Sequence, residues 1–469
     1  MALPLLAAYL ILAPPAGDLA AATYRSELFA RHPFATWDTG WYAVHGHWLP
    51  GYSLLSPALG ALLGVRLLLA LSALAAVVLF GLIAERLFGR AAGRVAAGVF
   101  ALGFCVGLLS GRVPYDLGFA IGLGSVLALM RGALPLALVL AALTSAASPV
   151  AGAFLALAGL AVVFGEALHA MRSPLALGYA HASGAEDRAG AHGRSDALLR
   201  LVRDPRVARA ICLTAAALLP ILILTLAFPE GGFEPFAAGA FWPALGGVLL
   251  IALLLPHGPL SERGRLVVRV GAALYALALI AAYVLRTPMG GNAARLGPLL
   301  AAPLLAGVLW EHRRVALLAL APVLLYWQLE TPINDYTALA GNPSVHASYY
   351  APLLARLRSL DRGDPTIVEV PLTKAHWEAA YLAGHDGVAL ARGWERQLDE
   401  RYAQLFYRPT LTAAAYRAWL IENHVAYVAL PDAPLDSAGR AEGALVARGL
   451  PYLRETWRTK HWRLYRVMG

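Results

Sequence analysis

The chain has 469 residues, of which 59% are hydrophobic and 14% are charged, and its mean hydropathy is +0.60. Soluble globular proteins carry about 25% charged residues, so the composition excludes that class and predicts an integral membrane protein. The net charge is +9, but the basic residues lie in short turns between apolar runs and form no clustered face, which excludes a nucleic-acid partner.

Apolar runs follow one another from the N-terminus to about residue 328. Crossing the hydrocarbon core of a bilayer takes about 20 apolar residues, and we expect about eleven transmembrane helices, several of them short. The first run lacks a preceding basic segment, which favours an uncleaved span over a signal peptide. The expected spans lie near residues 2–16, 67–86, 95–110, 115–131, 133–146, 150–169, 208–228, 238–255, 267–285, 297–310 and 314–328.

Residues 53–64, YSLLSPALGALL, are too short to cross alone and contain Pro57. This run predicts an interfacial or re-entrant helix that leads into the second span.

Arginines in the turns predict the orientation. With these spans, every arginine-rich turn faces the same side, which the positive-inside rule makes cytoplasmic. The turns contain Arg86, Arg90 and Arg94; Arg131; Arg263, Arg265 and Arg269; Arg313 and Arg314; and the arginines of the cytoplasmic loop 170–207. The outer side then receives the loop 17–52, the turns 110–115 and 286–296, the loop 229–237 and the C-terminal region.

After Glu330 the composition becomes that of a soluble domain. Period-two apolar runs predict short strands in TIVEVPL, GVALA, AYVALP and RLYRV. Helices are expected around 345–360, 375–383, 410–423 and 437–448. The fold class is therefore a polytopic α-helical membrane protein, with a transmembrane domain over 1–328 and a small extracytoplasmic α/β domain over 329–469.

The outer loop 17–52 contains the sequence TWDTGWYAVHGHW. Its Asp38, among aromatic residues near the membrane surface, is a candidate general base or ligand of a divalent cation. Alternatively, Asp38 forms a turn with the following Thr-Gly. His45 and His47 stand too close together for the usual zinc pair and have no Cys or Glu nearby, so they are expected to hydrogen-bond within the loop or to line a polar pocket.

Trp41 and Tyr52 of the same region suit two roles. They fit an aromatic belt at the membrane interface, and they equally fit a platform for sugar rings.

Two further outer turns contain ionisable residues. Asp116 and Arg112, in SGRVPYDLG, are either a structural ion pair or part of a site in which Asp116 frames a metal or acceptor and Arg112 faces an anion. In RTPMGGNAARLGP, Asn292 and Arg295 are candidate phosphate ligands, and the two glycines allow close backbone approach. The alternative for Arg295 is an interfacial arginine that snorkels to the headgroups.

In the expected outer domain, tryptophans stand beside charged residues in KAHWEAAY and ARGWERQLD. Such a pattern suits carbohydrate binding, and it suits docking of the domain onto the membrane part somewhat better. The candidates are His376, Trp377, Glu378, Arg392 and Trp394.

The order of these features resembles the GT-C superfamily of membrane glycosyltransferases. It is most similar to bacterial multi-pass membrane proteins labelled as related to 6-pyruvoyl-tetrahydropterin synthase, a label that implies no pterin chemistry here. The local matches are WDTGWY with HWLPGYSLLSP, SGRVPYDLG, TSAASPVAG, PMGGNAARLG, and the pair HWE and RGWERQLD.

The resemblance implies a glycosyltransferase, inverting if displacement is in line, in the bacterial cytoplasmic membrane. It would transfer a sugar from a polyprenyl-phosphate donor to a glycan or glycolipid acceptor outside. It maps an acidic residue that serves as base or metal ligand onto Asp38 and a second one onto Asp116. The first outer loop has no Asp-x-Asp or Asp-Glu pair, so Mg or Mn binding by Asp38 and Asp116 stays open.

Two other classes of function compete with this interpretation. A transporter or flippase of a lipid-linked substrate typically shows inverted repeats and polar residues at mid-membrane, whereas the polar candidates here cluster at the outer face. The third class is a non-catalytic membrane scaffold whose outer domain binds a partner in the cell envelope.

Overall fold

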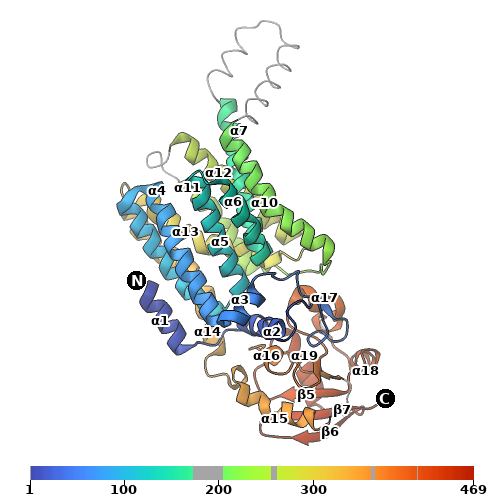
Figure 1. Cartoon of the computed structure of the whole chain (residues 1–469). Helices are drawn as coiled ribbons and strands as arrows, with labels where there is room; N and C mark the ends of the chain where they lie inside the picture. The colour runs from blue at the N-terminus through green and yellow to red at the C-terminus, as the bar shows by residue number, and fades with distance from the viewer. Residues whose placement is uncertain (1, 173–203, 255–260, 361–364, 409) are drawn as a thin grey trace.

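The computed structural model describes residues 2–172, 204–254, 261–360, 365–408 and 410–469. A bundle of apolar helices forms one part of the molecule, and a mixed α/β domain covers one end of the bundle (Figure 1). The predicted fold class, a multi-pass helical membrane protein with a small C-terminal α/β domain, is confirmed.

Seven stretches among the described residues are long and apolar enough to cross a membrane, and three shorter apolar helices accompany them. Together with the second arm of α4 they match the predicted spans one for one. The bundle contains α1 (Ala2–Leu12), α4 (Val65–Gly107), α5 (Val113–Met130), α6 (Leu134–Ala147), α7 (Pro149–Arg172), α10 (Pro205–Ala227), α11 (Ala238–Leu254), α12 (Glu262–Val284), α13 (Leu296–Leu309) and α14 (Arg314–Leu339).

The longest helix, α4, reverses direction at Gly89, whose φ of 79° and ψ of 170° are not helical. Glycine adopts this positive φ without a steric penalty. The two arms pack against each other, with the rings of Phe80 and Phe100 stacked at 4.1 Å between centroids. Two predicted spans, 67–86 and 95–110, are therefore the two arms of one helical hairpin.

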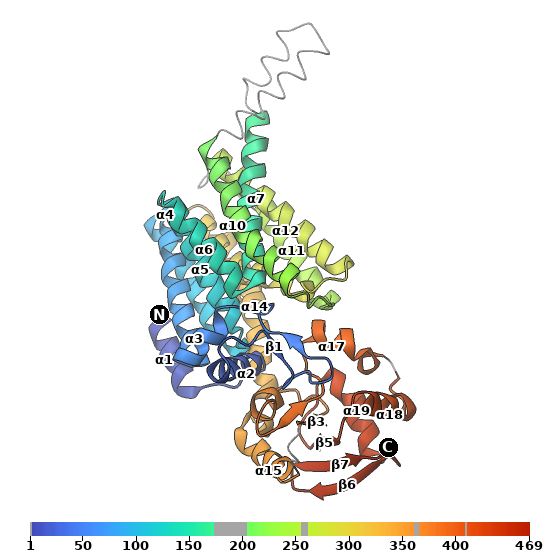
Figure 2. The same cartoon turned by 45° about the vertical axis from the view of Figure 1, so that its right-hand side comes forward.

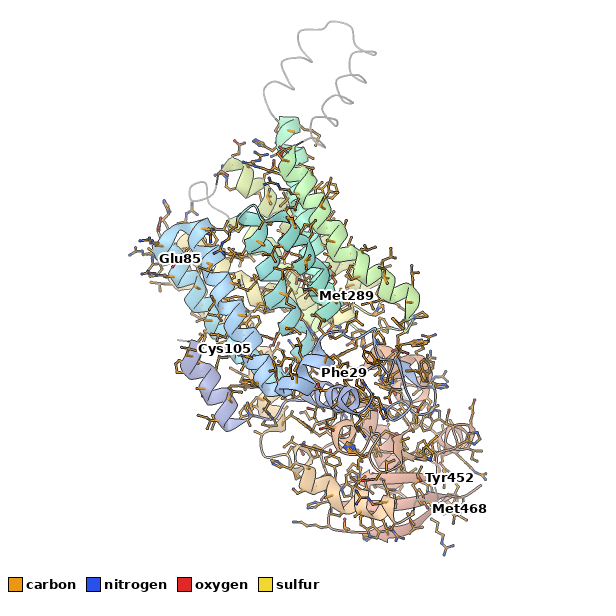
Figure 3. All side chains as sticks on the ribbon, viewed as in Figure 1. Phe29, Glu85, Cys105, Met289, Tyr452 and Met468 are labelled. Carbon is orange, nitrogen blue, oxygen red and sulfur yellow. The ribbon has the colours of Figure 1, made fainter. Side chains whose placement is uncertain are left out.

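The arginine-rich turn around Gly89 and the α/β domain lie at opposite ends of the bundle. Figure 3 shows Glu85, beside that turn, far from Tyr452 and Met468 of the C-terminal domain. The predicted orientation requires this separation. Which end faces the cytoplasm stays a prediction, and most of the loop 170–207 lies outside the described residues.

The segment 17–52 is more regular than the predicted loop. It begins with α2 (Asp18–Arg31), an amphipathic helix whose buried face includes Leu19 and Tyr24. The missed helix packs against α3 (Ser56–Leu63), the short helix expected over 53–64, and against α16 (Glu378–Tyr381) of the C-terminal domain. After α2, the short strands β1 (Trp37–Asp38) and β2 (His47–Trp48) pair antiparallel.

The C-terminal domain has a five-stranded sheet in the order β4-β3-β5-β7-β6. β3 runs parallel to β4 and β5, whereas β7 is antiparallel to β5 and β6. All four predicted strands are present, and β6 was missed. The strands are β3 (Thr366–Glu369), β4 (Val388–Leu390), β5 (Tyr427–Pro431), β6 (Leu453–Arg458) and β7 (Trp462–Val467).

Helices cover this sheet and connect it to the bundle. The predicted helices correspond to α15, α16, α18 and α19, and α17 is additional. α14 runs through the predicted domain boundary at 328 and ends only at Leu339. Besides α16, the domain contains α15 (Ala347–Arg358), α17 (Arg396–Tyr402), α18 (Ala413–Glu422) and α19 (Ser437–Ala447).

Candidate active site

A cavity of about 600 Å³ lies where the helix bundle meets the C-terminal domain. Its walls come from α2, the ends of α5, α7 and α10, the turn before α13, and the start of α17. Figure 2 shows β1 and α17 between the bundle and the sheet, which is the level of this cavity. Both parts of the molecule therefore contribute side chains to one cavity.

Two arginines that the sequence singled out, Arg112 and Arg295, line the cavity. The Nε of Arg112 lies 3.7 Å from the Asp18 carboxylate, and its Nη2 lies 3.6 Å from Asp335. Arg295 lies 5.4 Å from the centre of the Tyr115 ring, and it makes no hydrogen bond or ion pair with any residue that the structure describes. Its guanidinium thus keeps its donors for a ligand.

Part of the cavity lining is apolar. Ile221, Leu224 and Phe228 from the end of α10 line it together with Val150 and Ala153 of α7. Because α7 and α10 are among the helices suited to cross a membrane, this flank belongs to the bilayer part of the protein. The cavity therefore joins a cationic wall to an apolar one.

Carboxylates of five residues also line the cavity, and two of them, Glu395 and Asp436, belong to the C-terminal domain. Glu395 receives both terminal nitrogens of Arg25 at 2.8 and 2.6 Å, and the Arg25 side chain is only 2% exposed. Asp436 lies 3.3 Å from Nε2 of His376 and caps α19 through the N–H groups of Ala438 and Gly439. The five residues are Asp18, Glu230, Glu234, Glu395 and Asp436.

The other two glutamates belong to residues 229–235, PEGGFEP, which we call the acidic loop. The carboxylate of Glu230 accepts the backbone N–H of Trp48, whereas that of Glu234 has no hydrogen bond or ion pair to any described residue. Burial raises the pKa of each carboxyl to about 7 because an ion loses favourable hydration there.

The acidic loop is clamped between the two parts of the molecule. Gly232 and Gly290 both have positive φ, and a Cβ on either would collide with the carbonyl of Gln397 or of Glu234, respectively. The Glu234 N–H donates to the Thr287 carbonyl at 3.0 Å. The glycine pair in PMGGN thus permits the close approach that places Glu234 beside the Arg295 turn.

Of the predicted site residues, six line the cavity and eight do not. Those in the lining are Arg112, Asn292, Arg295, Tyr52, His376 and Trp394. Those outside the lining are Asp38, Asp116, His45, His47, Trp41, Trp377, Glu378 and Arg392.

Asp38 is 6% exposed and fully engaged in hydrogen bonds. Its carboxylate accepts from the Tyr24 hydroxyl at 2.6 Å, from the Gly40 N–H at 3.0 Å and from the Trp41 N–H at 3.3 Å. These are the contacts of the turn-forming aspartate, the alternative interpretation of the sequence. Its role as general base stays a prediction.

The neighbours of Asp38 are buried as well. Nδ1 of His47 is 3.1 Å from the Trp41 carbonyl and 3.8 Å from Asp38. Burial lowers the pKa of His47 to about 4, so the imidazole is neutral at neutral pH. Trp41 is 0% exposed, and the ring of His45 stacks on Tyr402 at 4.4 Å. These residues form a packed unit beside the cavity.

The predicted metal ligands, Asp38 and Asp116, are both buried and lie outside the cavity lining. Asp116 is buried in the first turn of α5, and both oxygens of Asp38 are used by hydrogen bonds. Within the described ranges, no group of three His, Cys, Asp or Glu side chains is arranged to hold a metal ion. Dependence of the activity on Mg or Mn stays a prediction.

The aromatic candidates of the outer domain make protein contacts. The Trp394 ring stacks on His376 at 4.5 Å with an interplanar angle of 7°, and Trp41 lies 4.8 Å away. These contacts favour the docking interpretation over stacking of a sugar on Trp394. Trp377 stacks on Tyr381 at 5.2 Å.

The two charged candidates are buried inside the domain. Arg392 bonds Glu369, Asp399 and Glu442 at 2.8, 3.0 and 2.6 Å. Glu378 accepts from the Thr373 hydroxyl at 2.6 Å. Both side chains therefore support the fold of the domain.

Sequence reasoning missed Asp18, Glu230 and Glu234. The signal for the last two was available, since PEGGFEP puts two carboxylates and two glycines into a short outer turn between apolar spans. Asp18 directly follows the first span, where it reads as an ordinary helix N-terminal residue.

No protein-family model matches the chain, and no characterised protein matches it by sequence. Among solved structures, the Archaeoglobus fulgidus oligosaccharyltransferase, tethered to an acceptor peptide with the NVT sequon, shares 11% identity over 89% of this chain, with a TM-score of 0.48. This chain spans 65% of that protein's length. ArnT from Cupriavidus metallidurans, bound to undecaprenyl phosphate, shares 13% identity over 96% of this chain and 93% of its own, with a TM-score of 0.42.

Proposed function

We propose that the chain is a membrane glycosyltransferase of the GT-C type that transfers a sugar from a polyprenyl-phosphate donor to a cell-envelope glycan or glycolipid on the outer face of the cytoplasmic membrane. The observation that carries the proposal is the cavity itself. It combines Arg295, which has no ion-pair partner among the described residues, with Arg112 beside it and an apolar flank at one end of a membrane helix bundle. A lipid-linked phosphate has the same two parts, an anion and an apolar tail.

The two arginines have a clear role in such a reaction. Guanidinium groups bind phosphate oxygens through charge-assisted hydrogen bonds. As the bond between the anomeric carbon and the phosphate oxygen breaks, negative charge grows on the phosphate. Arg295, with Arg112 next to it, offsets that charge without having to reorganise. In-line attack by the acceptor inverts the anomeric carbon.

The attachment of the outer domain favours an enzyme over a transporter. Alternating access needs the walls around a site to separate, whereas one wall here is joined to α2 by the buried, bidentate Arg25–Glu395 pair. A cavity whose walls are bonded to each other suits chemistry at one membrane face.

Release of polyprenyl phosphate from radiolabelled polyprenyl-phosphate sugars by the purified protein in lipid tests the proposal. We expect turnover by the wild type and a loss of about 10- to 100-fold in Arg295→Met, the size of one or two lost hydrogen bonds to a charged group. Arg286→Met is the matched control, because Arg286 has a 75% exposed side chain and lies outside the cavity lining. A wild type that turns over no donor contradicts the proposal.

A further inference from the structure

We propose that Glu234 of the acidic loop is the general base that removes the proton from the acceptor hydroxyl. This inference rests on the proposed glycosyltransferase function. A general base is needed when the attacking group of the acceptor is a neutral hydroxyl. The proposal therefore specifies a hydroxyl-bearing acceptor.

Among the carboxylates that line the cavity, Glu234 differs in its contacts. Asp18 pairs with Arg112 at 3.7 Å, Glu395 is bound on both oxygens by Arg25, and Asp436 caps α19 and faces His376. Glu230 accepts the Trp48 N–H. Glu234 alone of these keeps both oxygens free of the residues that the structure describes, so it can accept a proton from a ligand.

The position of Glu234 is held by its backbone. Its N–H donates to Thr287, and its carbonyl lies against Gly290, where a Cβ would collide with it. Gly290 begins the 3-10 turn Gly290–Arg295, which ends with the proposed phosphate ligand. Base and phosphate site are therefore held on adjoining segments, which keeps both within reach of one bound substrate.

The proposed step balances. The acceptor oxygen forms a bond to the anomeric carbon while its proton passes to the Glu234 carboxylate. The bond from the anomeric carbon to the phosphate oxygen breaks, and its electron pair leaves with the polyprenyl phosphate beside Arg295. The glutamic acid then returns the proton to water. No oxidant, reductant or further reactant is needed.

The electrostatic surroundings suit a base at neutral pH. Burial raises the pKa of Glu234, and the nearby negative charges of Asp18 and Glu395 act in the same direction, whereas Arg295 and Arg396 act against it, leaving it at about 7. A base is most effective when its pKa lies near the working pH. Activity should therefore rise as the pH increases through about 7, where the carboxylate becomes ionised.

The test compares wild type, Glu234→Gln and Glu234→Asp in the donor turnover assay across pH 5 to 9. Glu422→Gln, on the exposed face of α18, is the matched control. We expect Glu234→Gln to lower kcat by about 100-fold or more and to abolish the rise near neutral pH. Glu234→Asp should recover part of kcat, and binding of polyprenyl phosphate should remain within twofold of wild type for both.

A second variant tests the geometry without removing the carboxylate. Gly290→Ala forces the Glu234 carbonyl away and should lower kcat while the rise near neutral pH persists. An active wild type whose Glu234→Gln variant keeps both kcat and the pH profile would overturn the assignment and leave the glycosyltransferase intact. A wild type inactive with every donor would overturn the transferase, and the assignment with it.

Discussion

Two segments meet at the cavity, and they differ in how their polar groups are used. The aromatic segment, residues 36–52, has the denser set of chemically capable side chains, yet its Asp38 and His47 are buried and bonded within the segment or to α2. The acidic loop has only two ionisable side chains, and one of them, Glu234, is left without a partner among the described residues. A side chain whose hydrogen-bonding groups are unused in the fold is therefore a better candidate for a functional group than one chosen by its chemical type alone.

This contrast makes a physical prediction about variants. Substitutions in the aromatic segment, or in the α2 residues that bond to it or pack on it, should lower stability, because they remove hydrogen bonds or packing contacts that the folded state uses. Changes in the acidic loop should lower turnover and leave stability nearly unchanged. Three variants test the difference.

The largest effect on stability is expected for Arg25→Met, which removes the cation that contacts the Tyr52 ring and pairs with Glu395. The Arg25 guanidinium lies 3.8 Å from the centre of the Tyr52 ring and bonds both oxygens of Glu395. Leaving a buried carboxylate unpaired typically costs about 3–5 kcal/mol, so thermal unfolding in detergent should occur well below the wild-type temperature. Arg31→Met, which loses two exposed hydrogen bonds, to the carbonyls of Gly384 and Glu27, should change the unfolding temperature little. Equal melting temperatures for the two variants would contradict the structural role of Arg25.

Asp38→Asn should have an intermediate effect. The amide retains one oxygen for the Gly40 N–H, but its NH2 group replaces the oxygen that accepts from the Tyr24 hydroxyl and the Trp41 N–H, which lowers stability by about 1–2 kcal/mol. We expect kcat of the folded variant to fall much less than that of Glu234→Gln. A folded Asp38→Asn variant without turnover would instead support the base predicted for Asp38 and remove the contrast between the segments.

The smallest effect is expected for Glu230→Gln, at the contact between the two segments. The folded-state pKa of Glu230, about 7, lies above the ordinary value for glutamate. The protonated form is therefore favoured by folding, and this contribution is full below about pH 4 and is lost as the pH rises through 7. Because the side chain is partly exposed, the contribution is below about 1 kcal/mol. Between pH 5 and 8, the melting temperature of the variant should fall slightly less than that of the wild type. An equal fall in both proteins would contradict the contribution of Glu230 to the pH dependence of stability.

The spans and the strands of the outer domain could be predicted because they depend on local patterns. Apolar runs of sufficient length define the helices, and even the α4 reversal lies in the arginine-rich turn that the sequence predicted. Two of the exceptions, α2 and β6, lack such a pattern for different reasons. The buried face of α2 includes Arg25, whose partner Glu395 is 370 positions away. β6 is an edge strand whose sequence LRETWR is mostly polar and exposed.

The site was predicted in part for the same reason. Arg112 and Arg295 stand out as cations at an expected membrane face, and both line the cavity. Glu234 did not stand out, because its lack of a partner depends on how the Gly290 turn and the outer domain close around the acidic loop. Conversely, Asp38 attracted attention by its neighbours in the sequence, and those same neighbours satisfy its hydrogen bonds in the fold.

The two-sided construction of the cavity has a consequence for biosynthesis. Its second wall consists of residues 394–398, 407 and 436–438, which leave the ribosome after every bundle helix has been made. A growing chain whose bundle helices are already in the bilayer has the arginine wall. It does not yet have the second wall that would shield a bound sugar from water. The cavity is therefore completed only when the outer domain docks.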